Sequence, residues 1–251
     1  MTKNHRMLEK SLQILEYISQ HTEGKTLAEI CAFVEMPKSS VHSIVHTLAN
    51  LGYVNAKKPE GVYTVGLKCF EIGSRYLNDK AFFQQVKKVL AKVSSAFNET
   101  THFALLDALE VVYTHKFEST QAIRMVSSIG KRNPAHATAL GKAILSTFSD
   151  EEIMALYDGI PLISLTEKTV VCLEVLLDQI RKIRQSGVAY ESGESTPGIK
   201  CYAVPIRTPY KALRAAMSIS IPLFRVEDGN ERYVQELLEA KADLEAYAVE
   251  A

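Results

Sequence analysis

The chain has 251 residues, of which 47% are hydrophobic and 23% are charged, a composition that indicates packed structure rather than disorder. Its 29 basic residues equal its 29 acidic residues, so the net charge excludes neither nucleic acid nor any other class of partner. Residues 1–75 hold nine basic and seven acidic side chains, which leaves 20 and 22 for the rest. The length is long for one globular core and comfortable for two.

The cysteines are scattered, with no C-x-x-C pair and no short disulfide framework: Cys31, Cys69, Cys172 and Cys201. This spacing fits reduced thiols in a cytoplasm. The amino terminus lacks the continuous apolar core of a signal peptide, and no stretch approaches the roughly 20 apolar residues that span a bilayer. We therefore expect a soluble cytoplasmic protein without a membrane partner.

The first 66 residues predict three helices followed by a hairpin. Apolar residues recur at helical spacing in the first segment: Leu8, Leu12, Leu15 and Ile18. A capping-box pattern at 26–29 begins a second helix, and Pro37 and Gly52 bracket a third over about 38–51. Two β-favouring runs around a Lys-, Pro- and Gly-containing turn then predict a hairpin. Together these elements indicate a winged helix-turn-helix.

The third helix divides into two faces when it is projected at 100° per residue. The predicted buried stripe consists of Val41, Ile44, Val45, Leu48, Ala49 and Leu51. The opposite face presents Ser39, His42, Ser43, His46 and Asn50. A helix with such an outer face has the size and chemistry to enter a major groove and hydrogen-bond base edges.

Two alternatives apply to the histidines on this face. His42 and His46 are four residues apart, the spacing with which a helix offers two imidazoles to zinc. The residues between them include no acid, and no third ligand is near in the sequence, so an H-E-x-x-H zinc site is not expected. A polar face that is merely solvated is the second alternative. The adjacent hairpin favours DNA reading over both.

The segment after the hairpin is helix-prone, with interruptions predicted near Gly73 and Asn78. Its second part carries a helical stripe of Phe82, Val86, Leu90, Val93 and Phe97. Such a segment could link two domains and pack against a partner chain. It could equally be the first helix of the second domain, and the sequence leaves both interpretations open.

The remainder alternates strand-like and helix-like runs, which predicts an α+β domain. Strands are predicted at 101–107, 110–117, 122–128, 188–192, 200–206 and 215–221. Helices are predicted after Pro134, from the capping box at 149–152, over 173–186 before Gly187, and around 233–247. On the last strand, Ser218 and Ser220 point to one face. Their hydroxyls could contact a ligand or solvent, because alternation does not say which face is wet.

An enzyme would need a constellation such as Cys201 with His136 or His102 and Glu191 as a base. No nucleophile motif surrounds the cysteine, and a lone strand cysteine is most often a small buried hydrophobe. We therefore expect no catalytic residue, no metal and no cofactor. A pure protein-interaction module, which would explain the winged helix without DNA, is a third alternative.

Several segments resemble one family in order and spacing over nearly the whole chain. They include "KTLAEICAFVEMPKSSVHSIVHTLANLGYV", "RMVSSIGKRNPAHATALGKAIL" and "ESGESTPGIKCYAVPI". These segments resemble the IclR-type (isocitrate lyase regulator) bacterial transcriptional regulators. The resemblance implies a winged helix-turn-helix DNA-binding domain over 4–66 and a linker helix segment used in dimerisation over 67–92. It implies a GAF-like α/β effector-binding domain with an antiparallel sheet over 93–251.

The outer helix face and the resemblance together predict the DNA-binding residues Lys38, Ser39, Ser40, His42, Ser43, His46, Lys57 and Lys58. Ser43 stands where the family often has a basic residue, so attraction to phosphates must rely more on the lysines and on the amino-terminal Lys3, Arg6 and Lys10. In the second domain the resemblance implies effector contacts from Met125, Ala139, Leu140, Glu191, Cys201, Ser218 and Ser220. Ala139 and Leu140 would contribute main-chain amides at a helix start, which favours a carboxylate.

Two residues depart from the family pattern in this implied ligand pocket. Glu191 stands where an aspartate is common, and Asn133 stands where a leucine often closes the pocket. These polar groups suggest a ligand more polar than the smallest keto acids, such as a hydroxylated or sugar acid. We expect a repressor of a catabolic operon, which binds a pseudo-palindromic operator as a homodimer or homotetramer. The small organic-acid effector would shift the population between spacings of the DNA-binding domains.

Overall fold

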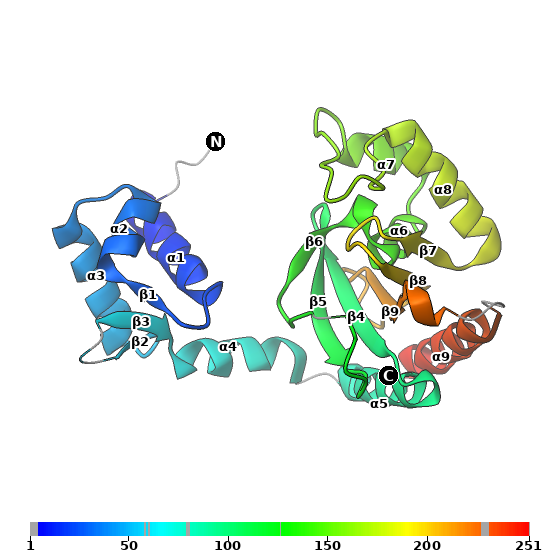
Figure 1. Cartoon of the computed structure of the whole chain (residues 1–251), viewed down its shortest axis with the longest axis horizontal. Coiled ribbons are helices and arrows are strands. Elements are labelled where there is room, and N and C mark those ends of the chain that lie inside the picture. Colours follow the sequence, from blue (N-terminus) through cyan, green and yellow to red (C-terminus); the bar gives the residue numbers. More distant parts are fainter. Residues whose placement is uncertain are drawn as a thin grey trace. The chain divides into compact units, whose positions relative to one another are not determined.

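The computed structural model describes residues 5–57, 59, 61–78, 81–125, 127–226 and 231–250. The chain divides into two compact units, Met1–Asp79 and Lys80–Ala251 (Figure 1). Each unit has its own hydrophobic core. Among the helices of these described ranges, none is long and apolar enough to cross a membrane.

The first unit is a winged helix-turn-helix, as the sequence predicts. Its elements are α1 (Arg6–Ser19), β1 (Lys25–Thr26), α2 (Leu27–Val34), α3 (Lys38–Asn50), β2 (Val54–Lys57), β3 (Val62–Val65) and α4 (Leu67–Asn78). The β2–β3 hairpin is antiparallel, and β1 pairs with β3 to give a small sheet of order β1-β3-β2. The pairing of β1 was not predicted, because two residues are too few to show a periodicity.

Local sequence signals account for how α2 and α3 are placed. The capping box is present: Thr26 accepts the Glu29 N–H, and the Glu29 carboxylate accepts the Thr26 N–H at 2.8 Å. Glu35 ends α2 in the left-handed region with φ 53°, and Pro37 precedes α3. Gly24 also has positive φ and lies so close to β3 that an added Cβ would be 2.6 Å from the Tyr63 carbonyl oxygen. This glycine therefore permits the β1 pairing.

The core of the first unit contains most of the apolar residues that were predicted to be buried, but three of the predicted leucines are exposed. Its buried members are Ile14, Ile18, Ile30, Val34, Val41, Ile44, Val45 and Val54. Leu51, which was predicted in the buried stripe of the third helix, is 59% exposed because it lies at the C-cap, beyond the last helical turn. Leu8 and Leu12 of the first periodic pattern are also exposed.

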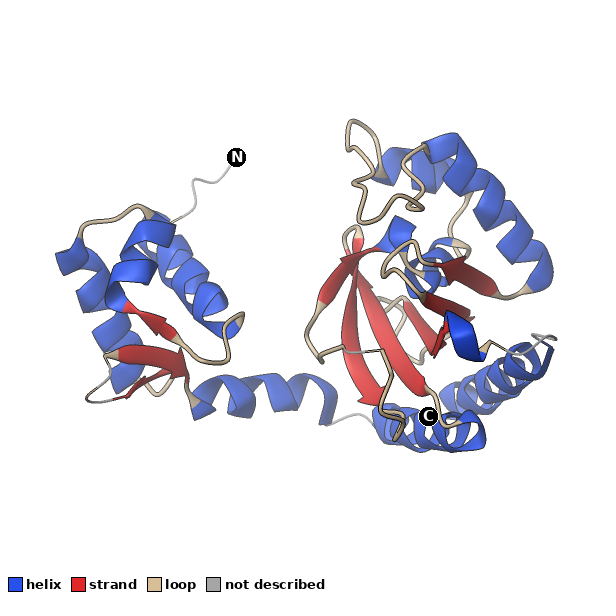
Figure 2. Ribbon diagram, viewed as in Figure 1, coloured by secondary structure: helices blue, strands red, loops and turns tan. Residues whose placement is uncertain are grey.

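The second unit is built on one curled antiparallel sheet (Figure 2). Its strands are β4 (Thr100–Asp107), β5 (Glu110–Phe117), β6 (Arg132–Pro134), β7 (Ala189–Ser192), β8 (Ile199–Ile206) and β9 (Ala215–Pro222), in the order β6-β5-β4-β9-β8-β7. Its helices are α5 (Ala81–Phe97), α6 (Ala139–Leu145), α7 (Asp150–Leu156), α8 (Leu173–Ser186) and α9 (Glu231–Glu250), with short 3-10 turns at Ala135–Ala137 and Leu223–Arg225.

Helices cover the two faces of this sheet. On one face, α5 and α9 pack through aromatic contacts such as Phe82–Phe103, with ring centroids 6.3 Å apart, and Phe97–Tyr233, at 4.8 Å. On the other face, α6 and α8 complete a core with residues of β4, β5, β8 and β9. Figure 1 shows α6 between the sheet and α8. The α+β class with an antiparallel sheet is confirmed.

Two expectations about local structure were wrong. Residues 122–128 do not form a strand where the structure describes them. Backbone carbonyls that would bond to a neighbouring strand instead accept hydrogen bonds from side chains. The Arg225 guanidinium donates to the Ile123 carbonyl at 2.8 Å, and the Lys116 ammonium donates to the Ser127 carbonyl. Helix α4 also continues through Gly73, since one helical glycine costs only about 1 kcal/mol relative to alanine.

The segment 67–92 contains more than one element. Helix α4 ends at Asn78 within the first unit, and α5 begins at Ala81 as part of the second unit. The predicted stripe along α5 is buried at Phe82, Val86, Leu90 and Val93. The compact second unit thus begins before residue 93, where the sequence places the start of the effector domain.

Candidate functional site

The third helix presents a polar face to solvent. Ser39, His42, Ser43, His46 and Asn50 are all exposed, whereas Val41, Ile44 and Val45 are buried against α1 and α2. Pro37 precedes the helix without a side-chain cap. The Ser40 N–H already donates to the Pro37 carbonyl at 3.0 Å. By helix geometry the N–H groups of Lys38 and Ser39 have no acceptor within the helix, which leaves them to an external acceptor such as phosphate.

The two histidines on this face contact each other. The His42 and His46 rings are stacked with centroids 6.1 Å apart, and the Asn50 amide lies 3.2 Å from His46 Nδ1. His46 is therefore already engaged on one side, whereas His42 makes no hydrogen bond within the described part of the unit. Within the described ranges, no group of three or more His, Cys, Asp or Glu residues could hold a metal ion.

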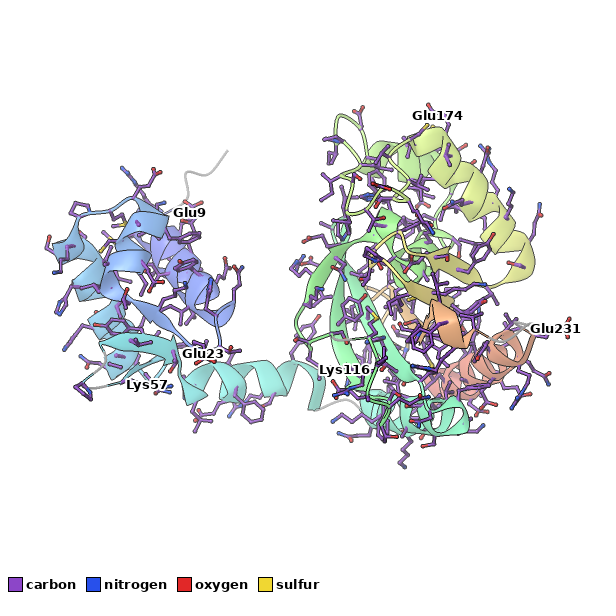
Figure 3. The ribbon with its side chains drawn as sticks, in the orientation of Figure 1. Glu9, Glu23, Lys57, Lys116, Glu174 and Glu231 are labelled. Carbon is purple, nitrogen blue, oxygen red and sulfur yellow. The ribbon has the colours of Figure 1, made fainter. Side chains whose placement is uncertain are left out.

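The other predicted DNA-binding residues flank this helix. Lys38 and Ser39 are exposed at the start of α3, and Ser40 is half-buried beside them. Lys57 is exposed at the end of β2 in the wing (Figure 3). Lys58 and Lys3 lie outside the described residues. A shallow hollow of about 560 Å³ runs along α3 and includes three of the predicted serines among its walls: Met7, Ser11, Ser39, Ser40, Ser43, Ile44, Thr47 and Leu48.

In the second unit, a row of polar side chains crosses three neighbouring strands. Glu191 on β7 is directly opposite Cys201 on β8, and Cys201 is opposite Ser220 on β9. Residues that are directly paired share one face of a sheet. Ser218 lies two positions from Ser220 and therefore shares that face, which packs toward α6.

This row lines a cavity of about 10 Å³ together with the start of α6. The lining residues are Tyr113, Thr138, Ala139, Leu140, Glu191, Ser195, Cys201, Ser218 and Ser220. The structure thus brings together six of the seven residues that the resemblance implies. The seventh, Met125, is buried in the adjoining hydrophobic cluster but does not line the cavity.

Sequence reasoning missed three residues of this cavity. Thr138 caps α6, accepting the Gly141 N–H at 2.9 Å, and its S/T N-cap pattern could have been recognised. Ser195 follows Glu191 in "ESGES" and donates its hydroxyl proton to that carboxylate. Tyr113 enters because a bulge between Phe103 and Ala104 changes the register of β5, which no local pattern reveals. Its hydroxyl accepts from Asn133 at 3.3 Å, which adds to the polarity of the wall.

Glu191 is almost fully buried at 1% exposure. Its carboxylate accepts the Glu194 N–H at 2.7 Å and the Ser195 hydroxyl at 2.9 Å. Burial raises the pKa of Glu191 because a charged carboxylate loses its hydration, and the hydrogen bonds oppose this rise. The Glu191 side chain is therefore held in a fixed position, and its carboxylate can accept few further hydrogen bonds from a ligand.

Cys201 does not form a catalytic pair. Its sulfur lies 3.2 Å from the Ser220 hydroxyl, and burial raises the pKa of the thiol well above its ordinary value, so the thiol stays neutral. His102 Nε2 instead lies 2.7 Å from the Ser127 hydroxyl, and His136 Nε2 lies 3.0 Å from the Ile163 carbonyl oxygen. Neither histidine is therefore paired with the thiol, and a thiol that stays neutral is not a nucleophile.

A buried ion pair supports the loop that carries Glu191 and Ser195. Lys142 of α6 is fully buried, and its ammonium lies 2.5 Å from the Glu194 carboxylate. Burial lowers the Lys142 pKa, whereas Glu194 opposes that shift. The Thr169 and Thr166 hydroxyls donate to the carbonyls of Glu194 and its neighbour Gly193, both at 2.7 Å. The loop is therefore clamped between α6 and residues 166–169.

Comparisons with known proteins agree with this architecture. Residues 7–57 match the family model described as the IclR helix-turn-helix domain, and residues 74–245 match that of the bacterial transcriptional regulator IclR C-terminal region. The HTH-type transcriptional regulator XynR of Escherichia coli is 32% identical, with 92% of each chain covered. The acetate operon repressor of Salmonella typhimurium is 29% identical, with 91% of this chain and 84% of that protein covered.

A solved structure gives the same result for the whole fold. The crystal structure of Thermotoga maritima IclR matches with a TM-score of 0.78 at 28% identity, covering 98% of this chain and 99% of that one. The helix-turn-helix unit and these matches define a DNA-binding transcriptional regulator rather than an enzyme. The chain belongs to the IclR family of bacterial transcriptional regulators.

Proposed function

We propose that the protein represses a catabolic operon and releases its operator when a small carboxylate or sugar acid binds in the second unit. It would act in the cytoplasm as a homodimer or homotetramer on pseudo-palindromic DNA, without a cofactor. The observation that carries this proposal is the convergence of polar groups from β7, β8, β9 and the start of α6 on one buried cavity.

For DNA reading, we assign base contacts to the exposed face of α3 and phosphate contacts to its flanks. His42 and Ser43 lie in the first half of the helix, where a recognition helix reaches base edges. Lys38, Ser39 and Ser40 would meet phosphates at the helix start, with Lys57 and Lys58 from the wing. His46 would contact phosphate or water, because Asn50 already lies beside its ring.

For effector binding, Ser218, Ser220 and Cys201 would offer hydroxyl and thiol groups to the ligand, and Glu191 would accept from a ligand hydroxyl. The main-chain N–H groups of Ala139 and Leu140 have no acceptor within α6 and would hold the ligand carboxylate. Met125 would add to the apolar wall. Asn133, through its bond to Tyr113, supports a polyhydroxylated ligand over a small keto acid.

A cavity of about 10 Å³ has room for only one water, so an acid must widen it. The clamped loop around Glu194 is the wall that would move, because it is held by hydrogen bonds rather than by a strand ladder. Binding would thus favour an open form over the closed one, which is a population shift.

Repression is supported by the acetate operon repressor, a relative named for that role. Self-association is supported by the exposed apolar side chains of α4, Leu67, Phe70 and Ile72, which are 68%, 71% and 51% exposed. Two-fold symmetry of a dimer would match a pseudo-palindromic operator.

DNA reading can be tested with a duplex selected from a random pool by the purified protein. The variant His42→Ala/Ser43→Ala should bind this duplex about 100-fold more weakly, since it loses contacts to more than one base. The variant Ser19→Ala/His21→Ala removes the same chemical groups from the end of α1 and should bind normally. Equal binding by all three proteins in fluorescence anisotropy would rule out α3 as the reading helix.

The ligand assignment can be tested by a thermal-shift screen of hydroxylated and sugar acids. D-gluconate represents the expected class, and pyruvate represents the smallest keto acids. An acid of the expected class should raise the unfolding midpoint of the wild type, and Ser220→Ala should remove that rise. Ser164→Ala, which changes an exposed hydroxyl, serves as the control. An equal rise in all three proteins would exclude this cavity.

A further inference from the structure

A second hollow in the second unit lies where β8 turns back into β9. It has a volume of about 710 Å³, and none of its lining residues lines the cavity at Glu191. Its walls come from the connection 207–214, from α9 and from the turn that follows α6. Sites for small molecules commonly measure roughly 300–1,000 Å³, so this hollow has the size of a metabolite site.

Most of the charged side chains around this hollow are basic. Arg207, Lys211, Arg214 and Lys241 face one carboxylate, that of Glu245. Four positive charges against one negative charge leave an excess of three positive charges, in a chain whose basic and acidic residues are equal in number overall. Like charges held close together repel one another, so this cluster does not stabilise the unit. An anion in the hollow would relieve that repulsion.

The single carboxylate does not neutralise the hollow. Glu245 accepts the backbone N–H of Arg207 at 2.8 Å, and its carboxylate lies 3.9 Å from the Lys241 ammonium. Its carboxylate therefore reaches from α9 to the first residue of the strand connection, and one carboxylate is shared between these two groups. The side chains of Arg207, Lys211 and Arg214 are exposed on the strand connection.

The strand connection is a rigid platform for these cations. The Thr208 hydroxyl donates to the Tyr210 carbonyl at 2.9 Å and accepts the Tyr210 N–H at 3.2 Å. The Leu213 N–H donates to the same Tyr210 carbonyl at 2.8 Å. The Arg214 carbonyl accepts the Leu106 N–H from β4 at 2.8 Å. Because the backbone is fixed before any ligand arrives, binding would order only side chains.

Arg214 is held in a defined orientation. Its guanidinium lies over the Phe148 ring, 5.2 Å from the ring centroid, at the end of the turn after α6. A guanidinium held by stacking keeps its N–H fork free for a planar pair of oxygens. Such forks bind phosphate and carboxylate oxygens in bidentate fashion.

We propose that this hollow is a second ligand site, which binds the phosphate monoester of a small metabolite. A phosphate ester carries about two negative charges at neutral pH, which matches three excess positive charges better than a single carboxylate does. Arg207, Lys211 and Arg214 hold the phosphate oxygens. The remaining volume accommodates the uncharged body of the metabolite against Pro205 and Ile206.

Isothermal titration of the full chain with glucose 6-phosphate tests this site. Saturable binding is expected for glucose 6-phosphate, none for glucose, and weaker binding for inorganic phosphate, which lacks the body that fills the hollow. The variant Lys211→Ala/Arg214→Ala should weaken binding of glucose 6-phosphate by about tenfold or more, since it loses two charge-assisted contacts. Lys211→Ala alone changes only an exposed side chain, and it should weaken binding by a smaller factor.

The matched control is Lys88→Ala/Lys131→Ala, which removes two exposed positive charges elsewhere in the same unit. This control should bind as the wild type does. Unchanged binding by Lys211→Ala/Arg214→Ala, or an equal loss in the control, overturns the proposal. Inorganic phosphate that binds as tightly as glucose 6-phosphate also overturns it. So does a parallel loss of affinity for duplex DNA in Lys211→Ala/Arg214→Ala, which would make the hollow a nucleic-acid contact.

Discussion

The exposed face of α3 and the cavity row of β7, β8 and β9 use similar polar side chains in opposite surroundings. On α3, His42 and Ser43 point into solvent and are held by few neighbours. In the cavity, Glu191 and Ser220 are 1% and 2% exposed and are bonded to adjacent groups. The first set of side chains costs the fold little, whereas the second set is part of what holds the unit together.

This difference in burial predicts whether a substitution in each region changes binding alone or binding together with the free energy of unfolding. When a polar side chain on the surface is replaced, its former hydrogen-bond partner can bond to water instead. A buried polar group that loses its partner leaves another group unsatisfied in an apolar environment. Substitutions on α3 should therefore change what the protein binds, and substitutions beside the cavity should change both binding and unfolding.

The largest effect is expected at the buried ion pair. Lys142→Met should lower the free energy of unfolding by about 3 kcal/mol or more, because the Glu194 carboxylate then stays buried without its cation. Adding Glu194→Gln removes that charge and should restore part of the loss. Urea denaturation measures both. Lys182→Met, on the exposed side of α8, is the control. A loss at Lys182 as large as at Lys142 would refute this account of the pair.

The next effect concerns acid stability. Burial, with a smaller contribution from Lys116, lowers the pKa of His102 to about 3. An unfolded histidine titrates near 6.5, so between these values the unfolded chain binds the extra proton, and the unfolding free energy falls as the pH falls. At pH 5 this amounts to about 2 kcal/mol relative to neutral pH.

His102→Gln should remove that part of the pH dependence. The variant keeps a side-chain donor near the Ser127 hydroxyl but has no proton to take up. Denaturation curves at pH 7 and pH 5 should therefore differ less for the variant than for the wild type. His115, whose pKa burial lowers to about 4, is present in both proteins and cancels in the comparison. Identical pH dependence would mean that His102 is not buried as a neutral group.

A smaller effect is expected at the cavity wall. Ser220→Ala should lower the unfolding free energy by about 1 kcal/mol, because the Cys201 thiol loses its hydroxyl neighbour at 3.2 Å. Thermal or urea unfolding without added acids measures this cost separately from ligand binding. A gain in stability would show that the cavity row is strained for function rather than mutually supportive.

The smallest effect on stability is expected on α3. His42→Ala should change the unfolding free energy by no more than about 0.5 kcal/mol, since the side chain is exposed. Its stacking on the His46 ring is a surface contact. A loss above 1 kcal/mol, a limit set by the typical cost of an exposed contact, would remove the contrast between the two regions.

Sequence patterns predicted the elements whose signals are local. The capping box of Thr26 and Glu29, the burial of Val41 and Val45 and the end of α8 at Gly187 all follow from spacing within a few residues. The patterns could not anticipate the loop at 122–128, because its carbonyls are bonded by Arg225 and Lys116 from other segments.

The same limit applies to the candidate sites. The outer face of α3 could be derived from helical geometry alone. Most of the cavity residues came from the family resemblance, since β7, β8, β9 and α6 are separated in the sequence and meet only in the fold. Tyr113 was missed because a bulge in the β4–β5 pairing brings it to the cavity. The Lys142–Glu194 pair, 52 residues apart, left no local signal.

In the proposed function, an acid in the buried cavity and DNA on α3 oppose each other. If the proposed function holds, linkage requires that the acid weakens operator binding by the same factor by which DNA weakens acid binding. The most direct measurement is the affinity for the selected duplex, by anisotropy, with and without saturating levels of the acid found in the thermal-shift screen. We expect a loss of about tenfold in the wild type and none in Ser220→Ala. An equal loss in both proteins, or no loss in the wild type, would contradict it.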